Sequence, residues 1–152
     1  MIMNNQVKNI TLNDYRFKAD FSNLDEIRSS IFNDAISIGF DEDSASKISL
    51  AVDEACTNLI RYSFNLDSNY IINITTQFDS KNLIVKIMDQ GNPFNPIEVN
   101  EPNMVEYFHS FKKGGLGIMI MKKFMDRIIY TPRDKNNSLN TLTLVKSLSI
   151  LN

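Results

Sequence analysis

Apolar and polar side chains alternate strictly near the start of the chain. The polar segment 1–13 is followed by residues 15–21 (YRFKADF), in which every second residue is apolar. A period of two is typical of a half-buried β-strand, because successive side chains of a strand point to opposite faces of the sheet. We therefore predict a first strand over residues 15–21, preceded by an N-terminal extension over residues 1–13.

Two helical patterns follow this strand. Between Ser22, a suitable N-cap, and Gly39, a suitable C-terminal stop, apolar residues recur every three or four positions. A second stripe with the same spacing begins after the acidic residues 41–43 and should reach about Tyr62. Such spacings place the apolar side chains on one side of a helix. Each predicted helix therefore has one face that can contribute to a core.

The rest of the pattern predicts four more strands and one more helix. Residues 70–78 and 83–88 are separated by a short polar turn, which indicates an antiparallel hairpin. A helix over residues 116–126 is followed by strands near residues 127–131 and 141–148. Helices and sheets that have one apolar face bury these faces against each other. We therefore predict an α/β two-layer sandwich, with the helices on one face of a mixed, mostly antiparallel sheet.

The long segment 88–114 has no sustained period and contains three prolines. Only residues 103–111 show a short helical pattern. Segments of this length inside a compact domain are usually lids or binding loops, or else disordered. We expect residues 95–113 to form a lid over a ligand.

Composition narrows the class of protein. A chain of 152 residues with 43% hydrophobic residues suits one folded domain and is short for two. Sixteen Lys and Arg against eighteen Asp and Glu give a net charge of −2, which offers no field to hold a nucleic-acid backbone. Cys56 is the only cysteine, and no apolar run reaches the roughly eighteen residues of a membrane span. We therefore expect a cytoplasmic protein that binds neither nucleic acid nor membrane.

The first candidate site lies on the second predicted helix. Glu54 and Asn58 stand four residues apart, so both side chains project from the same side of the helix. An amide oxygen suits Mg²⁺, which takes few protein ligands and completes its shell with water and substrate phosphates. A carboxylate one turn away can orient or deprotonate an attacking hydroxyl group. The alternative interpretation of this pair is an exposed polar stripe.

Two glycine-containing clusters complete the pattern. Residues 89–94 (DQGNPF) follow a predicted strand, where a carboxylate can accept the amine hydrogen of adenine and Gly91 lets the backbone approach the ring. Residues 112–117 (KKGGLG) open the third helix, where backbone N–H groups and two lysines suit a phosphate. Taken alone, the first cluster is equally a tight turn, and the second a helix boundary with solvated lysines.

The order of these clusters is more specific than any one of them. A helix with Glu54 and Asn58, a strand leading into Asp89-x-Gly91, a long loop and a glycine-rich helix start together resemble the GHKL ATPase superfamily. Within this superfamily, which has the Bergerat or histidine kinase-like ATPase fold, the sequence looks like the small stand-alone bacterial anti-sigma factor serine-protein kinases. The resemblance covers residues 14–148. It implies the two-layer fold of that superfamily, with ATP or ADP and Mg²⁺ as cofactors.

The resemblance implies a role for each matching residue. Asn58 would coordinate Mg²⁺, Glu54 would act as general base, and Asp89 would bind adenine. Gly91 would belong to the adenine pocket, and residues 95–113 would form the ATP lid. The remaining nucleotide contacts that it implies, from the glycine-rich box and the closing strand, are Lys113, Gly115, Leu116, Gly117 and Thr141.

Two positions depart from the pattern of these kinases. Four residues after Asn58, where they commonly carry His, this chain has Tyr62. At the start of the closing strand, where they commonly have Gly-Thr, it has Asn140-Thr141. Neither departure removes the presumed metal ligand or the presumed base.

The resemblance also implies a function. The protein would be an ATP-dependent serine-protein kinase and anti-sigma factor that phosphorylates a small anti-anti-sigma (STAS-type) protein, sequesters a sigma factor and forms a homodimer. A non-catalytic, ATP-gated partner-binding module of the same fold is the alternative, because only Glu54 separates the kinase from a nucleotide-binding protein. A nucleic-acid-binding regulator conflicts with the acidic charge balance.

Overall fold

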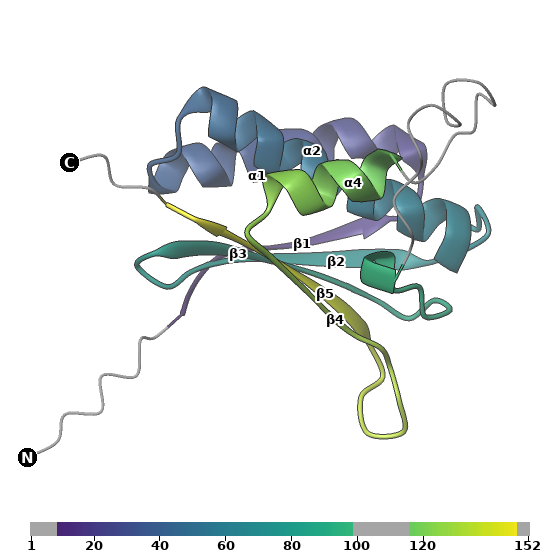
Figure 1. Ribbon diagram of the computed structural model, residues 1–152. Coiled ribbons are helices and arrows are strands. Elements are labelled where there is room, and N and C mark those ends of the chain that lie inside the picture. The colour runs from purple at the N-terminus through teal and green to yellow at the C-terminus, as the bar shows by residue number, and fades with distance from the viewer. Residues whose placement is uncertain (1–8, 99–115, 149–152) are drawn as a thin grey trace, which may run out of the picture.

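The computed structural model describes residues 9–98 and 116–148 and arranges them in two layers (Figure 1). Within these ranges, five strands form one sheet in the order β1-β2-β3-β5-β4, and all four neighbouring pairs are antiparallel. The helices lie together on one face of this sheet. The predicted α/β two-layer sandwich is confirmed, with antiparallel pairing throughout the described strands. The helical piece expected over residues 103–111 and most of the expected lid lie outside the described residues.

The elements follow one another in the predicted order. Their bounds are β1 Ile10–Lys18, α1 Leu24–Ile38, α2 Glu42–Asn58, β2 Ile71–Phe78, β3 Asn82–Asp89, α4 Leu116–Phe124, β4 Arg127–Thr131 and β5 Asn140–Ser147. Short 3-10 turns cover Phe21–Asn23 and Pro96–Glu98. A π-helical turn over Leu59–Ser63 continues α2, so the helix ends close to the predicted Tyr62.

Strand β1 starts earlier than its apolar pattern predicts. It pairs with β2 from Ile10 to Lys18, with a register shift between Thr11 and Asn13, and Phe21 lies in the following turn. The polar residues at its start are held by side-chain contacts instead of apolar burial; Asp14, for example, accepts a hydrogen bond from the Thr75 hydroxyl at 2.6 Å. Residues 10–13 therefore belong to the sheet and not to an extension.

The helix ends have defined caps. Gly39 has a left-handed φ of +114° and ends α1, as predicted. The predicted N-cap, Ser22, does not cap α1: its own N–H donates to Asp20 Oδ1 at 2.8 Å, and this contact starts the 3-10 turn before the helix. At the start of α2, Asp41 caps the N–H of Ser44 at 2.7 Å.

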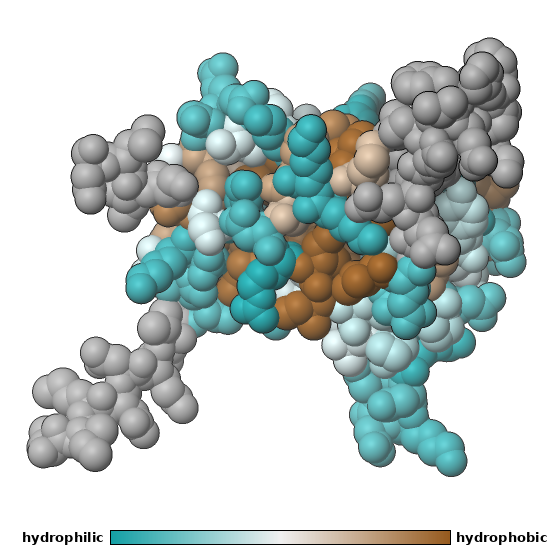
Figure 2. All heavy atoms as spheres, viewed as in Figure 1, coloured by the Kyte–Doolittle hydropathy of each residue, from teal (hydrophilic) through white to brown (hydrophobic). Residues whose placement is uncertain are grey.

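The core lies between the helices and one face of the sheet. Helix α2 is central, with α1 packed on one side of it and α4 on the other. Fully buried side chains come from both layers: Ile27, Ile31, Ile48, Val52, Ile72, Ile74, Leu83, Val85, Ile87, Met121 and Leu144. Apolar surface also shows between α4 and the β4–β5 strands (Figure 2). The apolar stripes of the predicted helices therefore face the sheet.

A buried carboxylate joins β1 to the helical layer. Asp34 of α1 accepts hydrogen bonds from Asn13 Nδ2 at 2.8 Å, from the Tyr15 hydroxyl at 2.9 Å and from the Thr76 hydroxyl at 2.7 Å. Burial, together with the hydrogen bond to Asp34, raises the pKa of Tyr15 well above its ordinary value. One side chain thus fastens α1, β1 and β2 to one another.

We expect Asp34→Ala to lower the free energy of unfolding by about 3 kcal/mol, because three donors lose a charged acceptor and the fully buried Thr76 hydroxyl finds no other. Urea unfolding at neutral pH measures this loss. Asp43→Ala is the control, since Asp43 is exposed and pairs with Lys47 at 2.9 Å on the surface of α2; its cost should be about 0.5 kcal/mol. Equal losses in the two variants would show that the Asp34 network adds no stability.

Candidate functional site

Asp89 is the buried polar end of strand β3. Its side chain is 2% exposed, and Oδ1 accepts hydrogen bonds from the Gly91 N–H at 2.8 Å and from Asn140 Nδ2 at 3.0 Å. Burial raises the pKa of Asp89 above its ordinary value, although the two hydrogen bonds and the nearby Arg133 guanidinium oppose this shift. The carboxylate is therefore held in place from two sides in a nearly dry position.

Gly91 is required where it stands because of a close contact. A Cβ at this position would lie 2.5 Å from Cε1 of the Phe64 ring, and Phe64 is 2% exposed and stacked on Tyr70 with ring centroids 4.5 Å apart. The ring has no free direction in which to move. Only glycine at position 91 allows the turn after β3 to pack on Phe64 while the Gly91 N–H donates to Asp89.

The opposite wall of the site is the last part of α2. Asn58 is 8% exposed, and its Nδ2 has no hydrogen-bond partner among the described residues. Glu54, one turn earlier, is half-buried; burial, reinforced by the adjacent Asp53 carboxylate, raises its pKa, while Arg61 opposes the rise. Asp53 itself faces α1, where its Oδ2 accepts from Arg28 Nη1 at 2.9 Å. Glu54 and Asn58 therefore share one side of the helix, as the spacing predicts.

Helix α4 covers Glu54 with its first turn. A Cβ on Gly117 would lie 2.9 Å from Cδ of Glu54 and closer still to Oε2. The backbone at Gly117 thus packs directly on the carboxylate of Glu54. Gly117 of the third helix and Glu54 of α2, which are about sixty residues apart in sequence, therefore lie against each other.

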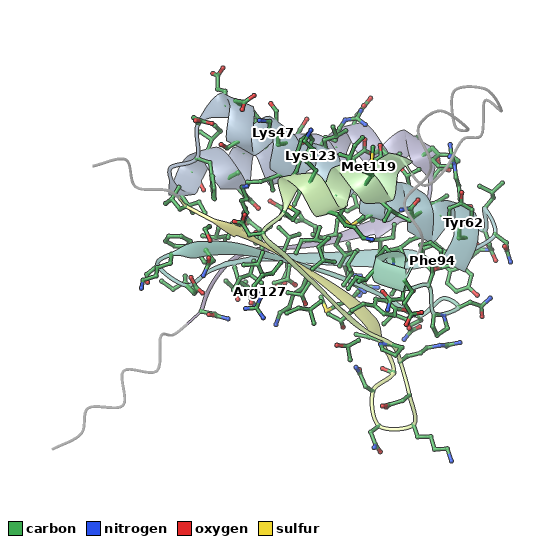
Figure 3. The ribbon with its side chains drawn as sticks, viewed as in Figure 1. Lys47, Tyr62, Phe94, Met119, Lys123 and Arg127 are labelled. Carbon is green, nitrogen blue, oxygen red and sulfur yellow. The ribbon has the colours of Figure 1, made fainter. Side chains whose placement is uncertain are left out.

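A small cavity lies between these walls. It is lined by Ala55, Asn58, Leu59, Asp89, Phe94, Pro96, Met121, Tyr130 and Leu142, and its free volume is about 10 Å³. The Phe94 N–H donates to the Tyr130 hydroxyl at 3.0 Å, and the Phe94 ring stacks on Tyr62 with centroids 5.3 Å apart (Figure 3). A space of this size holds about one water molecule at most, so the cavity in this conformation has no room for a purine base.

A much larger hollow lies on the open face of the sheet. It has a volume of about 580 Å³, and its lining includes Arg16, Asn73 and Gln90. None of the residues that the sequence singles out for nucleotide chemistry lines it. The small cavity beside Asp89 is therefore the candidate site, because the polar groups converge there.

The comparison with protein families agrees with this geometry. The family model for the histidine kinase-like ATPase domain matches residues 17–146. The chain belongs to this family. The family implies ATP binding. Within the two stretches that the structure describes, no helix is long and apolar enough to cross a membrane.

The sequence is also similar to several kinases and anti-sigma factors. Serine-protein kinase RsbW of Bacillus subtilis is 27% identical over 81% of this chain and 77% of its own length. Serine/threonine-protein kinase BtrW of Bordetella bronchiseptica is 28% identical over 63% of this chain and 67% of its own. The anti-sigma F factor of Geobacillus stearothermophilus is 29% identical over 57% of this chain and 60% of its own.

The described residues of this ATPase domain fit an adenine nucleotide. Asp89 Oδ2 accepts no hydrogen bond from them, so one carboxylate oxygen is left for a donor such as the adenine amine. The buried amide of Asn58 is incompletely satisfied at the same cavity, and such a group is usually completed by water, an ion or a ligand. Its oxygen is also a suitable ligand for Mg²⁺ carried by the nucleotide.

The structure brings most of the predicted residues together. Asn58 and Asp89 line the cavity, and the Gly91 N–H donates to Asp89. Glu54 lies one turn from Asn58 and beneath Gly117. Lys113, Gly115 and the side chain of Leu116, predicted as further nucleotide contacts, lie outside the described residues. The expected His position holds Tyr62, which is 45% exposed and stacks on Phe94 at the cavity's outer wall.

Thr141 is not brought to the site, which corrects its predicted role. In the β3–β5 pair Thr141 lies opposite Met88, while Asn140 lies opposite Asp89. Because side chains alternate along a strand, Thr141 points to the open face of the sheet and Asn140 points to the helices. The signal was present in the sequence: the apolar residues Leu142 and Leu144 mark the inward face of β5, and counting back by two reaches Asn140.

Proposed function

We propose that this protein is an ATP-dependent serine-protein kinase and anti-sigma factor of the cytoplasm, which phosphorylates a small anti-anti-sigma protein of STAS type and holds a sigma factor. The observation that carries the proposal is the position of Glu54, half-buried, one turn from Asn58 and beneath Gly117. Nucleotide binding needs no carboxylate there, whereas transfer to a serine hydroxyl benefits from a proton acceptor. Relatives named serine-protein kinase and anti-sigma F factor support the substrate and partner classes.

In this proposal the chain's residues position the reactants and move one proton. Asp89 accepts a hydrogen bond from the adenine amine, and Asn58 would hold Mg²⁺, which when bound neutralises charge on the phosphates. The serine Oγ forms a bond to the γ-phosphorus as the bond from that phosphorus to the bridging β–γ oxygen breaks. Glu54 takes the serine proton, and ADP and phosphoserine result. A raised pKa makes Glu54 a stronger proton acceptor than an ordinary carboxylate.

The direct test is incubation with labelled ATP and candidate partner proteins encoded beside its gene. Label on a serine of a small partner, with ADP formed in equal amount, supports the kinase. A protein that binds Mg·ATP and retains a sigma factor in an ATP-dependent complex, but labels no partner, would contradict the kinase and leave the non-catalytic binding module.

A homodimer is also part of this proposal, and it rests on the family resemblance. Of the alternating apolar residues 15–21, Phe17 and Ala19 are buried in the chain's own core at 9% and 2% exposed, whereas Phe21 is 43% exposed. Ile10, in contrast, is 62% exposed on this strand, which lies at the edge of the described sheet.

Asn58→Ala is expected to reduce, by about tenfold or more, the gain in ATP affinity that Mg²⁺ produces, because the amide oxygen is the proposed protein ligand of the ion. Affinity without Mg²⁺ should change little. Calorimetry with MgCl₂ and with EDTA separates the two effects. Asn69→Ala, at an exposed residue outside this cavity, is the matched control. The same Mg²⁺ gain in Asn58→Ala and wild type would remove Asn58 from the metal site.

A further inference from the structure

Asn140 occupies a position beside the base-binding carboxylate that the proposed chemistry leaves unexplained. It is the first residue of β5, lies directly opposite Asp89 of β3 and is 1% exposed. A primary amide this deeply buried must find partners for its two N–H bonds and its carbonyl oxygen, since an unsatisfied buried polar group loses its hydration without compensation. The contacts of Asn140 therefore indicate what it does.

Both ends of the Asn140 amide have partners. Oδ1 accepts from the Arg133 backbone N–H at 2.9 Å, while Nδ2 donates to Asp89 Oδ1 at 3.0 Å and to the Gly91 carbonyl oxygen at 2.9 Å. A backbone N–H can only donate, so the contact with Arg133 decides which end of the amide is oxygen. The N–H₂ end is thereby directed at Asp89 and at the turn that contains Gly91.

This arrangement acts on both the charge and the orientation of Asp89. The Asn140 amide and the Gly91 N–H both donate to Oδ1, which favours the ionised form of the carboxyl group and turns Oδ2 away from them. An ionised carboxylate only accepts hydrogen bonds. It therefore pairs with a base that presents an amine, as adenine does, and repels the 6-oxo group of guanine or hypoxanthine.

Other charged or titratable groups face Asp89 from three elements. Arg133 lies in the hairpin between β4 and β5, Cys56 in α2 and Tyr130 in β4. Burial raises the pKa of Cys56 and that of Tyr130 above their ordinary values, so neither ionises near neutral pH, and arginine stays charged. Among these neighbours nothing changes charge between pH 6 and 8.

We propose that Asn140 is a positioning residue for base recognition: its amide holds Asp89 ionised and turned so that Oδ2 meets the exocyclic amine of adenine. The residue then contributes to the choice of adenine over 6-oxo purines without touching the base. This inference rests on the proposed binding of ATP. It deepens that proposal by naming the group that controls the specificity of the adenine pocket.

Asn140→Asp tests this through its pH dependence. The introduced carboxyl has nearly the shape of the amide but donates to Asp89 only while it carries a proton, and two buried carboxyl groups in contact share one proton over a raised pH range. We expect ADP affinity, measured by calorimetry as a ratio to wild type at each pH, to lie within about threefold of wild type at pH 6. At pH 8 it should be at least about tenfold weaker.

Two further variants separate positioning from structure. Asn140→Leu has no donor, and it should bind ADP more weakly at every pH and discriminate less between ADP and IDP. Asn137→Asp adds the same charge to the same hairpin at an exposed side chain, and it should follow wild type throughout. Thermal unfolding at each pH checks that the variants are folded, and the pH dependence of Asn140→Asp carries the test if Asn140→Leu does not fold.

The possible outcomes distinguish this inference from the proposed function. An Asn140→Asp affinity ratio that stays constant with pH would overturn the inference alone, since a loss of structure has no reason to follow one proton. Unchanged discrimination between ADP and IDP in Asn140→Leu would do the same. Wild-type protein that binds neither ADP nor ATP at any pH would overturn the proposed function itself.

Discussion

Replacing Glu54 with glutamine is expected to slow phosphotransfer by about 10²–10⁴-fold while ATP affinity stays within a few fold of wild type. The amide has nearly the size of the carboxyl group and so keeps its place beneath Gly117, but it cannot accept the serine proton. Single-turnover formation of phosphoserine gives the rate, and calorimetry gives the affinity. Binding and chemistry should therefore separate in this variant.

The pH profile adds an independent readout for Glu54. A general base works only when deprotonated, so the wild-type rate should rise with pH through the raised pKa of Glu54. Glu54→Gln should lack this limb. Glu42→Gln, at an exposed residue of the same helix, is the control and should retain both rate and profile. A wild-type phosphotransfer rate and an unchanged pH–rate profile in Glu54→Gln would assign Glu54 a purely structural role. Phosphoryl transfer would then depend on positioning and charge stabilisation alone.

Asp89→Asn is expected to weaken ATP binding by about 10²-fold or more and to shift the preference toward ITP. The amide oxygen can still accept from Gly91 and Asn140, so its N–H₂ group replaces Oδ2 at the cavity. The N–H₂ group and the adenine amine are both donors, so they cannot form a hydrogen bond with each other. The same N–H₂ group can donate to the 6-oxo oxygen of hypoxanthine. The variant thus exchanges the hydrogen-bonding character of the site with little change in shape.

Competition between ATP and ITP for one fluorescent nucleotide measures the change. Asp67→Asn, at an exposed loop residue whose side chain accepts only from the Asn69 N–H among the described contacts, controls for the loss of one negative charge. Thermal unfolding confirms that Asp89→Asn is folded. An unchanged ratio of ATP to ITP affinity would mean that Asp89 does not read the base.

Local patterns predict most of the architecture. The three- and four-residue spacing of apolar positions predicts α1 and α2 within a few residues, because a helix buries one side of its own repeat. The same rule places Glu54 and Asn58 together, since both lie on one helix. The order of the clusters along the sequence predicts the histidine kinase-like ATPase family, whose family model matches residues 17–146. Features that depend on neighbours in sequence are therefore readable without coordinates.

The apolar pattern does not predict the start of β1, because contacts with distant segments hold these residues in the sheet. Its polar residues form side-chain hydrogen bonds with partners distant in sequence. Asn13 bonds to Asp34, and Asp14 bonds to Thr75. A period of two in hydrophobicity detects burial on one face of a strand. It does not detect backbone pairing at a sheet edge whose side chains hydrogen-bond, and so the prediction began five residues late.

The details of the site were decided by contacts between separate segments. Whether Asn140 or Thr141 faces Asp89 depends on the register between β3 and β5, which pairs Asp89 with Asn140, 51 positions away in sequence. A shift of one residue exchanges the two faces. Gly91 is required by the Phe64 ring and Gly117 by Glu54, neither of which is close in sequence. Helix and strand periodicity reflect forces within an element, whereas register and close packing are settled only when the elements meet.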